Sequence, residues 1–407
     1  MLNQYLPNDL LKEEFIKRDY IMTKVDKDDN WKGGALIVPF KAGAASSIAF
    51  GSLTASNDIA EDKYVRGSIS GHKEAWGSMI FNHRDLMEHD AISEQNFLKI
   101  LPGAIDDFLS YMKNVVSTNL LNGAHFANLT ADATANDGLI TVNRPDRFQI
   151  AQKVIVDDGD STAVTGYVST IDMNTKVVLL VTTRGGATPC DFSGASAMTV
   201  AQGAKCYNDG AQSNSFSDLR SALLSNANGG SSTLYGETKV SYPYLQAINL
   251  DGSDMTASNF LEKIFDKLVQ ARQFGKGNPT DAIMSYTNLG YCMKIIEQSK
   301  GSFNVVPNSQ KATQYGWMEI EVGSVTKGNF KLIGVQEADD DVVMFLDWRA
   351  LKFHSNGFFK KRTGPNGNQF FEVRATTGFS YILDVCLYGD LVVNRPSYCA
   401  IIHSIDI

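Results

Sequence analysis

A single long amphipathic segment constrains the fold more than any other feature of this sequence. Between Ser93 and Gly123, apolar residues recur at helical spacing and leave the opposite face polar. At about 1.5 Å per residue, the part after Pro102 is roughly 30 Å long, which is long for a globular domain. We therefore expect this helix to be a spine with an apolar core stripe made of Phe97, Leu101, Ile105, Phe108, Met112, Val115 and Leu120.

Residues with known positional preferences mark both ends of the spine. Ser93 is suited to cap a first short turn, and Pro102 to a first-turn position of the main segment. Asp106 and Asp107 favour the positive end of that segment, and Gly123 supplies a left-handed stop. The alternative is one unbroken helix that is kinked at Pro102.

The bulk composition indicates a folded chain of two or three domains. The chain has 407 residues, of which 43% are hydrophobic, so it has ample material for buried cores. No apolar run reaches about 18 residues, and residues 1–20 carry charges where a signal peptide needs an apolar centre. We expect no membrane segment and synthesis in the cytoplasm.

Cysteine and charge usage exclude several classes of protein. The five cysteines are scattered and never form a C-x-x-C pair, so we expect buried free thiols and neither a disulfide framework nor a zinc site. The net charge is −8 and no Lys/Arg block occurs. This argues against a protein that grips nucleic acid through a basic face, although it permits one that lies beside nucleic acid.

The segments before the spine suggest parts that do not bury themselves on their own domain. Residues 2–30 predict a short helix followed by an extended polar arm. Residues 36–53 and 63–81 alternate loosely and predict a long hairpin with a polar tip. Because both strands are rich in Gly, Ser and Ala, we expect the hairpin to project and to rest on a neighbour.

After the spine, the pattern predicts an inserted β domain and then mixed structure. Residues 140–208 hold four short β runs about ten residues apart, typical of a small sandwich or barrel that folds independently. Helices are predicted over residues 217–226 and 256–274, followed by a strand-then-helix step. The last third is rich in strands and ends with a long run over residues 370–402.

Candidate sites for metal chemistry do not satisfy their patterns. The group His83, Asp85, His89 and Asp90 lacks the H-E-x-x-H spacing, and polar residues at a junction explain it more simply. The acidic run at residues 157–160 resembles part of a calcium loop without its distal Glu, so we predict a plain turn. Residues 339–341 are predicted to be a solvated loop.

Motifs for enzymatic chemistry are missing as well. The GKGNPTD stretch has neither the Lys-Ser ending nor the glycine spacing of a phosphate loop, and no G-x-S-x-G occurs. No Ser or Cys has a matching His partner in any known pattern. We therefore predict that the protein is not an enzyme and uses no cofactor.

The order of the parts, rather than any motif, resembles a known family. Polar arm, projecting hairpin, long helix, small β insertion, α/β step and long terminal strands resemble, in that order, the major capsid proteins of tailed bacteriophages, which have the HK97-like fold. The terminal run is similar to the closing strands of that family, with a "YG-x-L-V-V-x-x-P" stretch formed by Tyr388, Gly389, Leu391, Val392, Val393 and Pro396.

The resemblance implies an α+β architecture with named parts. They are an N-terminal arm (1–34), an E-loop hairpin with flanks (35–92), the spine helix of the P-domain (93–137), an inserted β domain (138–210), a P-domain continuation (211–255), an A-domain (256–345), and long P-domain strands returning to the A-domain (346–407). The β insertion is similar to those of some relatives with short-tailed virions.

The resemblance also implies partners and a location. The chain would form hexamers and pentamers of an icosahedral shell in the virion, with a portal protein and with packaged double-stranded DNA bound without sequence specificity. Some relatives begin with a cleaved scaffolding region, whereas here the arm begins almost at once, so a separate scaffolding protein is expected. The hairpin-tip residues implied in subunit contacts are Ser56, Asn57, Asp58, Glu61, Asp62, Lys63 and Arg66.

Two further possibilities remain at this stage. One branch of the family forms Lys–Asn cross-links beside a Glu; Lys63 with Asn366 or Asn368 is available by type, but no Glu can be assigned, so cross-linking is not expected. The alternative function is a virion decoration or tail-associated β-rich binding protein. It would use the β insertion, Trp31 and Tyr167, although aromatic residues at strand spacing are more often core.

Overall fold

The computed structural model describes most of the chain. It describes residues 8–32, 34–41, 64–82, 94–133, 137–159, 163–192, 203–298, 317–322, 330–357, 359–361, 371–375 and 378–407. The chain divides into two compact units. The first combines residues 1–113 with residues 219–407, and the second comprises residues 114–218.

The predicted spine is one helix, α5 (Glu94–Asn122). It begins one residue after Ser93 and runs through Pro102 without interruption, so the unbroken alternative is the right one. Gly123 ends it with a positive φ of 97°, and the Gly123 N–H donates to the Asn119 carbonyl at 3.1 Å. The left-handed stop predicted from the sequence is therefore confirmed.

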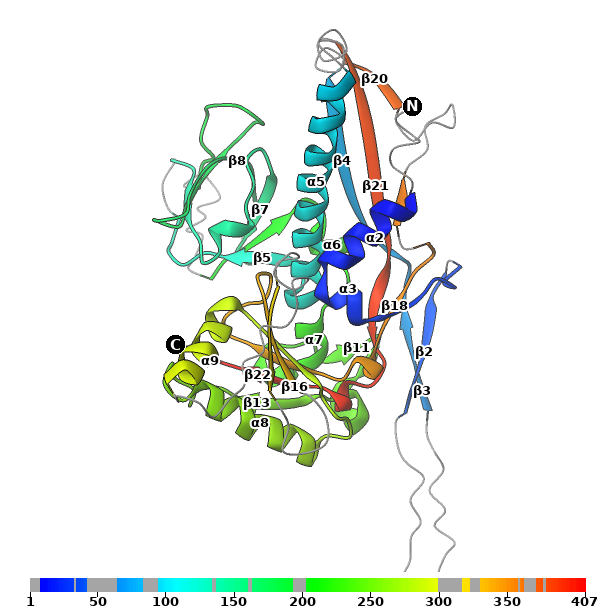
Figure 1. Cartoon of the computed structure of the whole chain (residues 1–407), viewed down its shortest axis with the longest axis vertical. Helices are drawn as coiled ribbons and strands as arrows, with labels where there is room; N and C mark the ends of the chain where they lie inside the picture. The colour runs from blue at the N-terminus through cyan, green and yellow to red at the C-terminus, as the bar shows by residue number, and fades with distance from the viewer. Residues whose placement is uncertain are drawn as a thin grey trace, which may run out of the picture. The chain divides into compact units, whose positions relative to one another are not determined.

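A six-stranded sheet built on the longest strand lies beside this helix (Figure 1). Strand β21 (Gly378–Val393) pairs antiparallel with β4 (Lys73–Asn82), from Ser380 opposite Asn82 to Gly389 opposite Lys73. The other strands are β1 (Asp26–Asp28), β18 (Leu351–His354), β19 (Phe359–Lys361) and β20 (Phe371–Ala375). The pairing of β4 with β21 joins two segments that are about 300 residues apart in the sequence.

Helix α5 packs closely on this sheet at a glycine. A Cβ atom on Gly77 of β4 would lie 2.7 Å from Cζ of Phe108, which is closer than van der Waals contact allows. Gly77 is opposite Val385, and Val385 and Leu387 are fully buried on β21. The absence of a side chain at Gly77 therefore makes room for the Phe108 ring.

We expect Gly77→Ala to lower the free energy of unfolding by about 1–3 kcal/mol, because the new methyl group overpacks against Phe108. Phe108→Ala alone should cost roughly 3–5 kcal/mol, as for a large core truncation. In the double variant the added methyl group has space, so the second change should cost much less than in the wild type. Urea unfolding of the four chains measures this coupling; strictly additive losses would contradict the contact.

A second six-stranded sheet forms the other core of the first unit. Its order is β13-β22-β17-β14-β16-β15, with mixed parallel and antiparallel pairs. The strands are β13 (Ile248–Asp251), β14 (Asp281–Met284), β15 (Trp317–Val322), β16 (Phe330–Val335), β17 (Val343–Leu346) and β22 (Ala400–His403).

Helices cover both faces of this second sheet. Helices α8 (Phe260–Phe274) and α9 (Tyr286–Gln298) form one apolar core with Ala282, Leu332 and Phe345. On the opposite face, the end of α7 (Leu219–Leu223) meets Asn249, whose side chain donates to the Leu223 carbonyl at 3.1 Å. The strand-then-helix step predicted after residue 280 corresponds to β14 and α9.

The second unit contains one six-stranded sheet, ordered β5-β10-β7-β8-β9-β6. Its strands are β5 (His125–Asn128), β6 (Leu139–Thr141), β7 (Lys153–Asp157), β8 (Val164–Asp172), β9 (Val177–Val181) and β10 (Lys205–Asn208), and a short helix α6 (Ala211–Asn214) follows. Val154, Leu180 and Cys206 are fully buried in its core. Strand β5 precedes residue 138, where the sequence placed the start of the insertion. Independent folding of this unit stays a prediction.

The predicted hairpin is only partly right. Strands β2 (Leu36–Lys41) and β3 (Tyr64–Ile69) pair antiparallel, with Leu36 opposite Ile69. The predicted second strand extended to residue 81, but residues 73–82 form β4 and pair with β21. Gly71, with φ of 79°, lies in the turn that ends β3 and begins β4. The foot of the hairpin is also packed on its own chain, since Val38 and Phe40 are buried.

The short helix predicted within residues 2–30 is confirmed, but the extended polar arm predicted after it is wrong for the described residues up to 32. They form α2 (Asn8–Arg18), α3 (Tyr20–Lys24) and β1, which pairs parallel with β18. Phe15 is fully buried and packs on Phe359, and Arg18 donates to Ser110 of α5 at 2.7 Å. The sequence did not predict that this segment packs on the rest of the chain, because α2 has charged residues on much of its surface.

Two predictions that were made from the composition can be compared with the structure. All five cysteines are buried and free, as expected. Among the described helices, none has both the length and the apolar character that a membrane crossing requires.

The predicted solvated loop at residues 339–341 does lie between two strands, β16 and β17, and Asp340 is exposed, but Asp339 and Asp341 form ion pairs, and nearby Glu337 is buried. The Lys113 ammonium of α5 pairs with the Glu337 carboxylate at 2.5 Å, and both side chains are less than a tenth exposed. Arg220 of α7 pairs with Asp339 at 3.1 Å and with Asp341 at 2.5 Å. Residues 337–341 therefore form an ionic junction between the spine helix, α7 and the second sheet.

Removing one partner of the buried pair should be far more costly than removing both. We expect Lys113→Met to lower the unfolding free energy by roughly 3–5 kcal/mol, because it leaves the Glu337 charge buried without its cation. The double variant with Glu337→Met should recover most of this loss. Denaturant titration of the single and double variants measures the difference, and equal losses in both would argue against a buried ion pair.

Candidate interaction surface

A tyrosine in a tight turn fixes the foot of the β2–β3 hairpin to the body of the first unit. Tyr235 and Gly236 form a two-residue turn between β11 (Thr233–Leu234) and β12 (Glu237–Thr238), with φ values of 49° and 89°. Positive φ at both positions is the geometry of a tight β-hairpin turn. The Tyr235 ring stacks on Phe40 of β2, with centroids 5.6 Å apart and planes 9° apart.

Tyr235 also connects the hairpin to the end of β21 through hydrogen bonds. Its carbonyl accepts from the Ser68 N–H of β3 at 2.9 Å. Its hydroxyl accepts from the Val393 N–H at 2.9 Å and donates to the Leu391 carbonyl at 3.3 Å. The backbone and side chain of Tyr235 therefore hold both hairpin strands against the end of β21.

We expect Tyr235→Phe to lower the unfolding free energy by about 1–3 kcal/mol, because the Val393 N–H loses its partner while ring stacking is kept. Tyr235→Ala removes the ring as well and should cost more. Thermal unfolding checks the first value. Hydrogen exchange at the Val393 amide should become faster in the phenylalanine variant; unchanged exchange would contradict the assigned role.

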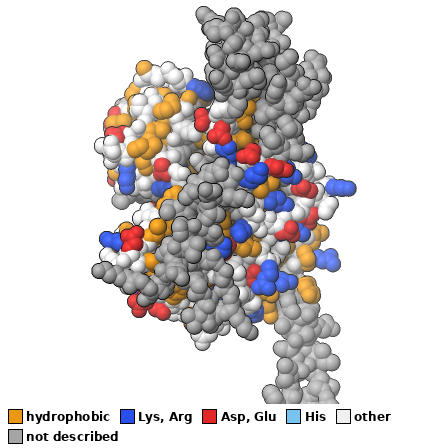
Figure 2. All heavy atoms as spheres, viewed as in Figure 1, with side chains coloured by type: hydrophobic (Ala, Val, Ile, Leu, Met, Phe, Trp, Pro, Cys, Tyr) orange, Lys and Arg blue, Asp and Glu red, His pale blue; other side chains and the backbone are white. Residues whose placement is uncertain are grey.

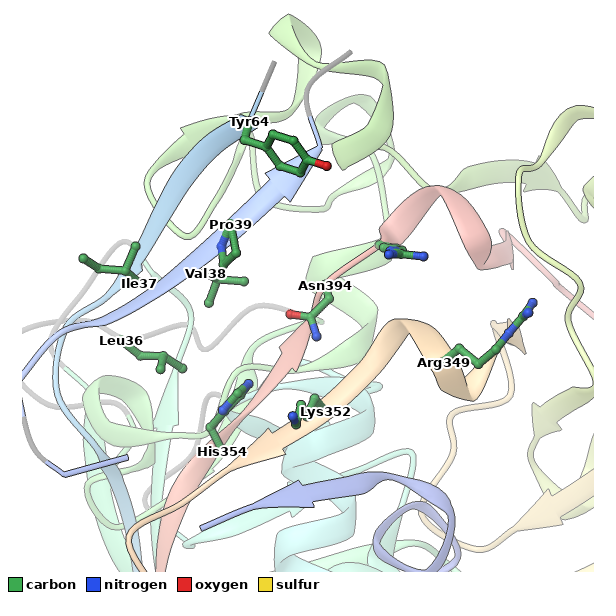
Figure 3. Close-up of a pocket in the computed structure, with 10 residues that line it drawn as sticks. Leu36, Ile37, Val38, Pro39, Tyr64, Arg349, Lys352, His354 and Asn394 are labelled. Carbon is green, nitrogen blue, oxygen red and sulfur yellow. The ribbon is translucent and has the colours of Figure 1, made fainter. Parts of the chain in front are cut away.

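A groove of about 420 Å³ lies between the hairpin foot and strands of the body (Figure 3). Tyr64 and the β2 side chains line one wall, and Lys352, His354 and Asn394 line the other. A smaller cavity of about 210 Å³ shares Tyr64 and Asn394 and adds Tyr244 of η5 (Pro243–Leu245) and Tyr398 of η7 (Pro396–Tyr398). The two cavities thus form one continuous depression.

Several cations of the groove are neutralised within the chain. Arg349 forms a two-pronged ion pair with Asp347, at 2.9 Å and 2.6 Å. Burial opposes ionisation of Asp347, but hydrogen bonds from Arg349 and the Asn278 N–H outweigh it and hold the pKa of that carboxyl below its usual value. Lys352 and His354 both approach Asp28 at 3.4 Å, and burial lowers the pKa of His354 despite that carboxylate.

Two other cations have no salt bridge to any residue that the structure describes. The Arg395 guanidinium donates to the Tyr398 hydroxyl at 3.2 Å and lies over its ring. The Lys276 ammonium lies 3.1 Å from the centroid of the Tyr244 ring. These cations keep their charge available to a partner, because an aromatic ring neutralises no charge.

Large apolar side chains are exposed next to these cations. Ile37 is 60% exposed, Tyr64 is 63% exposed, and Phe274, two residues before Lys276, is 69% exposed. Figure 2 shows hydrophobic and Lys/Arg side chains together where the hairpin meets the body. We call Ile37, Tyr64, Phe274, Lys276 and Arg395 the hairpin-foot surface. Exposed apolar groups rimmed by charge are typical of a protein contact rather than of a catalytic centre.

Most of the predicted contact residues fall outside the described part of the chain. Of the hairpin-tip set, only Arg66 is described, and it is exposed on β3; Ser56, Asn57, Asp58, Glu61, Asp62 and Lys63 lie outside the described residues, as do Asn366 and Asn368. Of the spine set, Ile105 and Met112 are buried, while Phe108 and Val115 are partly buried. The side chains of Phe97 and Leu101 lie outside the described residues.

The structure describes only some of the candidate metal-ligating residues. His83, Asp85, His89 and Asp90 lie outside the described residues. Asp157 accepts from the Gly159 N–H at 2.8 Å, which is a turn of the predicted kind. Within the described ranges, no three acidic, His or Cys side chains gather as metal ligands would.

Sequence patterns did not identify Tyr235, Lys276 or Arg395. Gly236 was the one local signal, since glycine favours tight turns. The two cations gave none, because they are about 120 residues apart in the sequence and come near each other only in the folded chain, where the Lys276 N–H donates to the Ser397 carbonyl.

Comparison with solved structures identifies the fold. Neither a protein-family model nor a curated protein sequence matches the chain. The capsid asymmetric unit of cyanophage A-1(L) aligns over 94% of this chain and 90% of its own, with 12% identity and a TM-score of 0.51. The capsid of a native GTA particle aligns over 96% and 91%, with 9% identity and a TM-score of 0.45. The SrpI encapsulin of Synechococcus elongatus PCC 7942 aligns over 95% and 87%, with 10% identity and a TM-score of 0.41.

The chain therefore shares its fold with the cyanophage A-1(L) capsid. This is the α+β HK97-like fold, which the order of the parts in the sequence implied.

Proposed function

We propose that this chain is a major capsid protein, which assembles as hexamers and pentamers into an icosahedral shell. The observation that carries the proposal is the likeness of fold to the cyanophage A-1(L) capsid over 94% of the chain. The role is structural and not enzymatic. The finished shell would be part of the virion and would enclose double-stranded DNA held without sequence-specific contacts.

The hairpin supports this proposal through its anchored foot. Tyr235 fixes β2 and β3 to β21, so the segment between Lys41 and Tyr64 starts from a fixed point on the body. Its tip, residues 56–63, consists mostly of polar and charged residues. We propose that they contact a neighbouring subunit, where large interfaces supply the stability of the assembly.

Other partners follow from the same proposal. A separate scaffolding protein would guide assembly, and a portal protein would occupy one vertex. The net charge of −8 suits a wall that lies beside dense DNA without gripping it, since a basic face would bind phosphates in a salt-dependent way.

Deletion of residues 56–62 should leave the monomer folded and impair assembly. The tip is polar, so its loss removes no core contact, whereas the subunit contact disappears. Circular dichroism and thermal unfolding should match the wild type, while sedimentation shows fewer particles. A deletion variant that unfolds, or one that assembles normally, would each contradict the assignment of the tip.

Size and shape separate the proposal from its alternative, a decoration or tail-associated binding protein. A shell subunit should elute from size-exclusion chromatography far above its 44.5 kDa mass, and negative-stain images should show rings or closed shells. Co-expression with candidate scaffolding proteins extends the test to chains that need a scaffold. A chain that stays monomeric in every case and binds preformed virions would favour the alternative.

A further inference from the structure

Helix α8 carries unlike charges at its two ends. Near its start, Lys263 and Lys267 both pair with Asp254, at 2.7 Å and 3.5 Å. Glu262 and Asp266 on the same helix are exposed, and neither forms a salt bridge with a described residue. Glu262 and Asp266 therefore remain without a salt bridge at the start of α8, where Lys263 and Lys267 are already paired with Asp254.

The acidic residues share one face with an exposed apolar side chain. Glu262, Asp266 and Val269 follow the i, i+4, i+7 spacing that places residues on one side of a helix, and Val269 is 64% exposed. We call these three residues the acidic α8 face. The other end of α8 belongs to the hairpin-foot surface, which includes the last helix residue, Phe274, and Lys276 two residues later.

We propose that the hairpin-foot surface of one copy docks on the acidic α8 face of a second copy. The inference rests on the proposed shell function and names the contact that would build its rings. Each surface combines exposed apolar area with two charges that lack a salt bridge within the described chain, and the signs are opposite. Such surfaces are complementary in both charge and apolar character.

Charge also determines the symmetry of this contact. A two-fold interface pairs a surface with itself, which would bring Lys276 and Arg395 against the same two cations of the partner. A head-to-tail contact instead pairs cations with Glu262 and Asp266. Because Glu262 and Lys276 are separated by roughly 20 Å along the helix direction, each copy offers both surfaces at once, as closure of a ring requires.

A protein partner suits the hairpin-foot surface better than a nucleic acid does. Ile37, Tyr64 and Phe274 supply apolar area that a phosphate backbone cannot use. The −8 net charge of the whole chain further favours contact with a second copy at a cationic surface.

A charge exchange tests the contact. We would compare the wild type with the pair R395E and K276E, the pair E262K and D266K, and the variant with all four changes, in the full-length chain with its scaffold if one is needed. Each pair should weaken association by about tenfold or more, because like charges then face each other. The fourfold variant has the net charge of the wild type and should recover most of its assembly, measured by sedimentation and negative-stain imaging.

Matched controls separate this contact from general charge effects. The pairs R184E with K205E and E297K with D406K make the same charge changes at exposed positions elsewhere and should assemble as the wild type does. Thermal unfolding identifies any variant that fails to fold, and R395Q with K276Q then replaces it and should show a smaller loss of assembly.

Several outcomes would overturn the inference. The first is normal assembly of both charge-reversed pairs. The second is a fourfold variant that assembles no better than the two pairs it combines. The third is a loss of DNA binding without a loss of assembly in the R395E and K276E pair. A wild-type chain that never exceeds a monomer would instead overturn the proposed shell function, so the two failures are distinguishable.

Discussion

The close packing of α5 on the β4–β21 pair is the contact on which the first unit depends. Gly77 lets the Phe108 ring lie against the sheet, and the strands on that face contribute fully buried Val385 and Leu387. A bulkier residue at position 77 would move the helix away from the sheet. That displacement would reach Lys113 on the same helix and, through it, the ionic junction with the second sheet.

The long-range contacts of this fold could not be predicted from sequence, whereas its local elements could. The stripe through Ile105 and Met112 and the stop at Gly123 identified α5 almost to the residue, because helical periodicity and left-handed glycine are local signals. The partner of β4 is about 300 residues away, and the sequence between 63 and 81 alternates equally well for a hairpin. Nothing local distinguishes the two pairings, so the wrong one was predicted for residues 73–81.

Charged residues were misjudged for a related reason. A cluster such as Glu337 to Asp341 usually lies in solvent, but Lys113 and Arg220 come from distant segments and neutralise it. The converse holds for Lys276 and Arg395, which lie near tyrosines and remain without an ion pair among the described residues. Whether a charge is satisfied within the chain is a property of tertiary structure, and it decides which surfaces are free to bind partners.

The hydrogen bond from Val393 to Tyr235 has a consequence for the order in which the molecule is completed. Strands β2 and β3 are synthesised early, but the backbone amide that secures their anchor belongs to residue 393, more than 300 residues later in the chain. The hairpin foot therefore cannot take its final position until the long strand β21 has been made and has paired with β4. Pairing of β2 with β3 and attachment of their foot to the body are thus separate steps of folding.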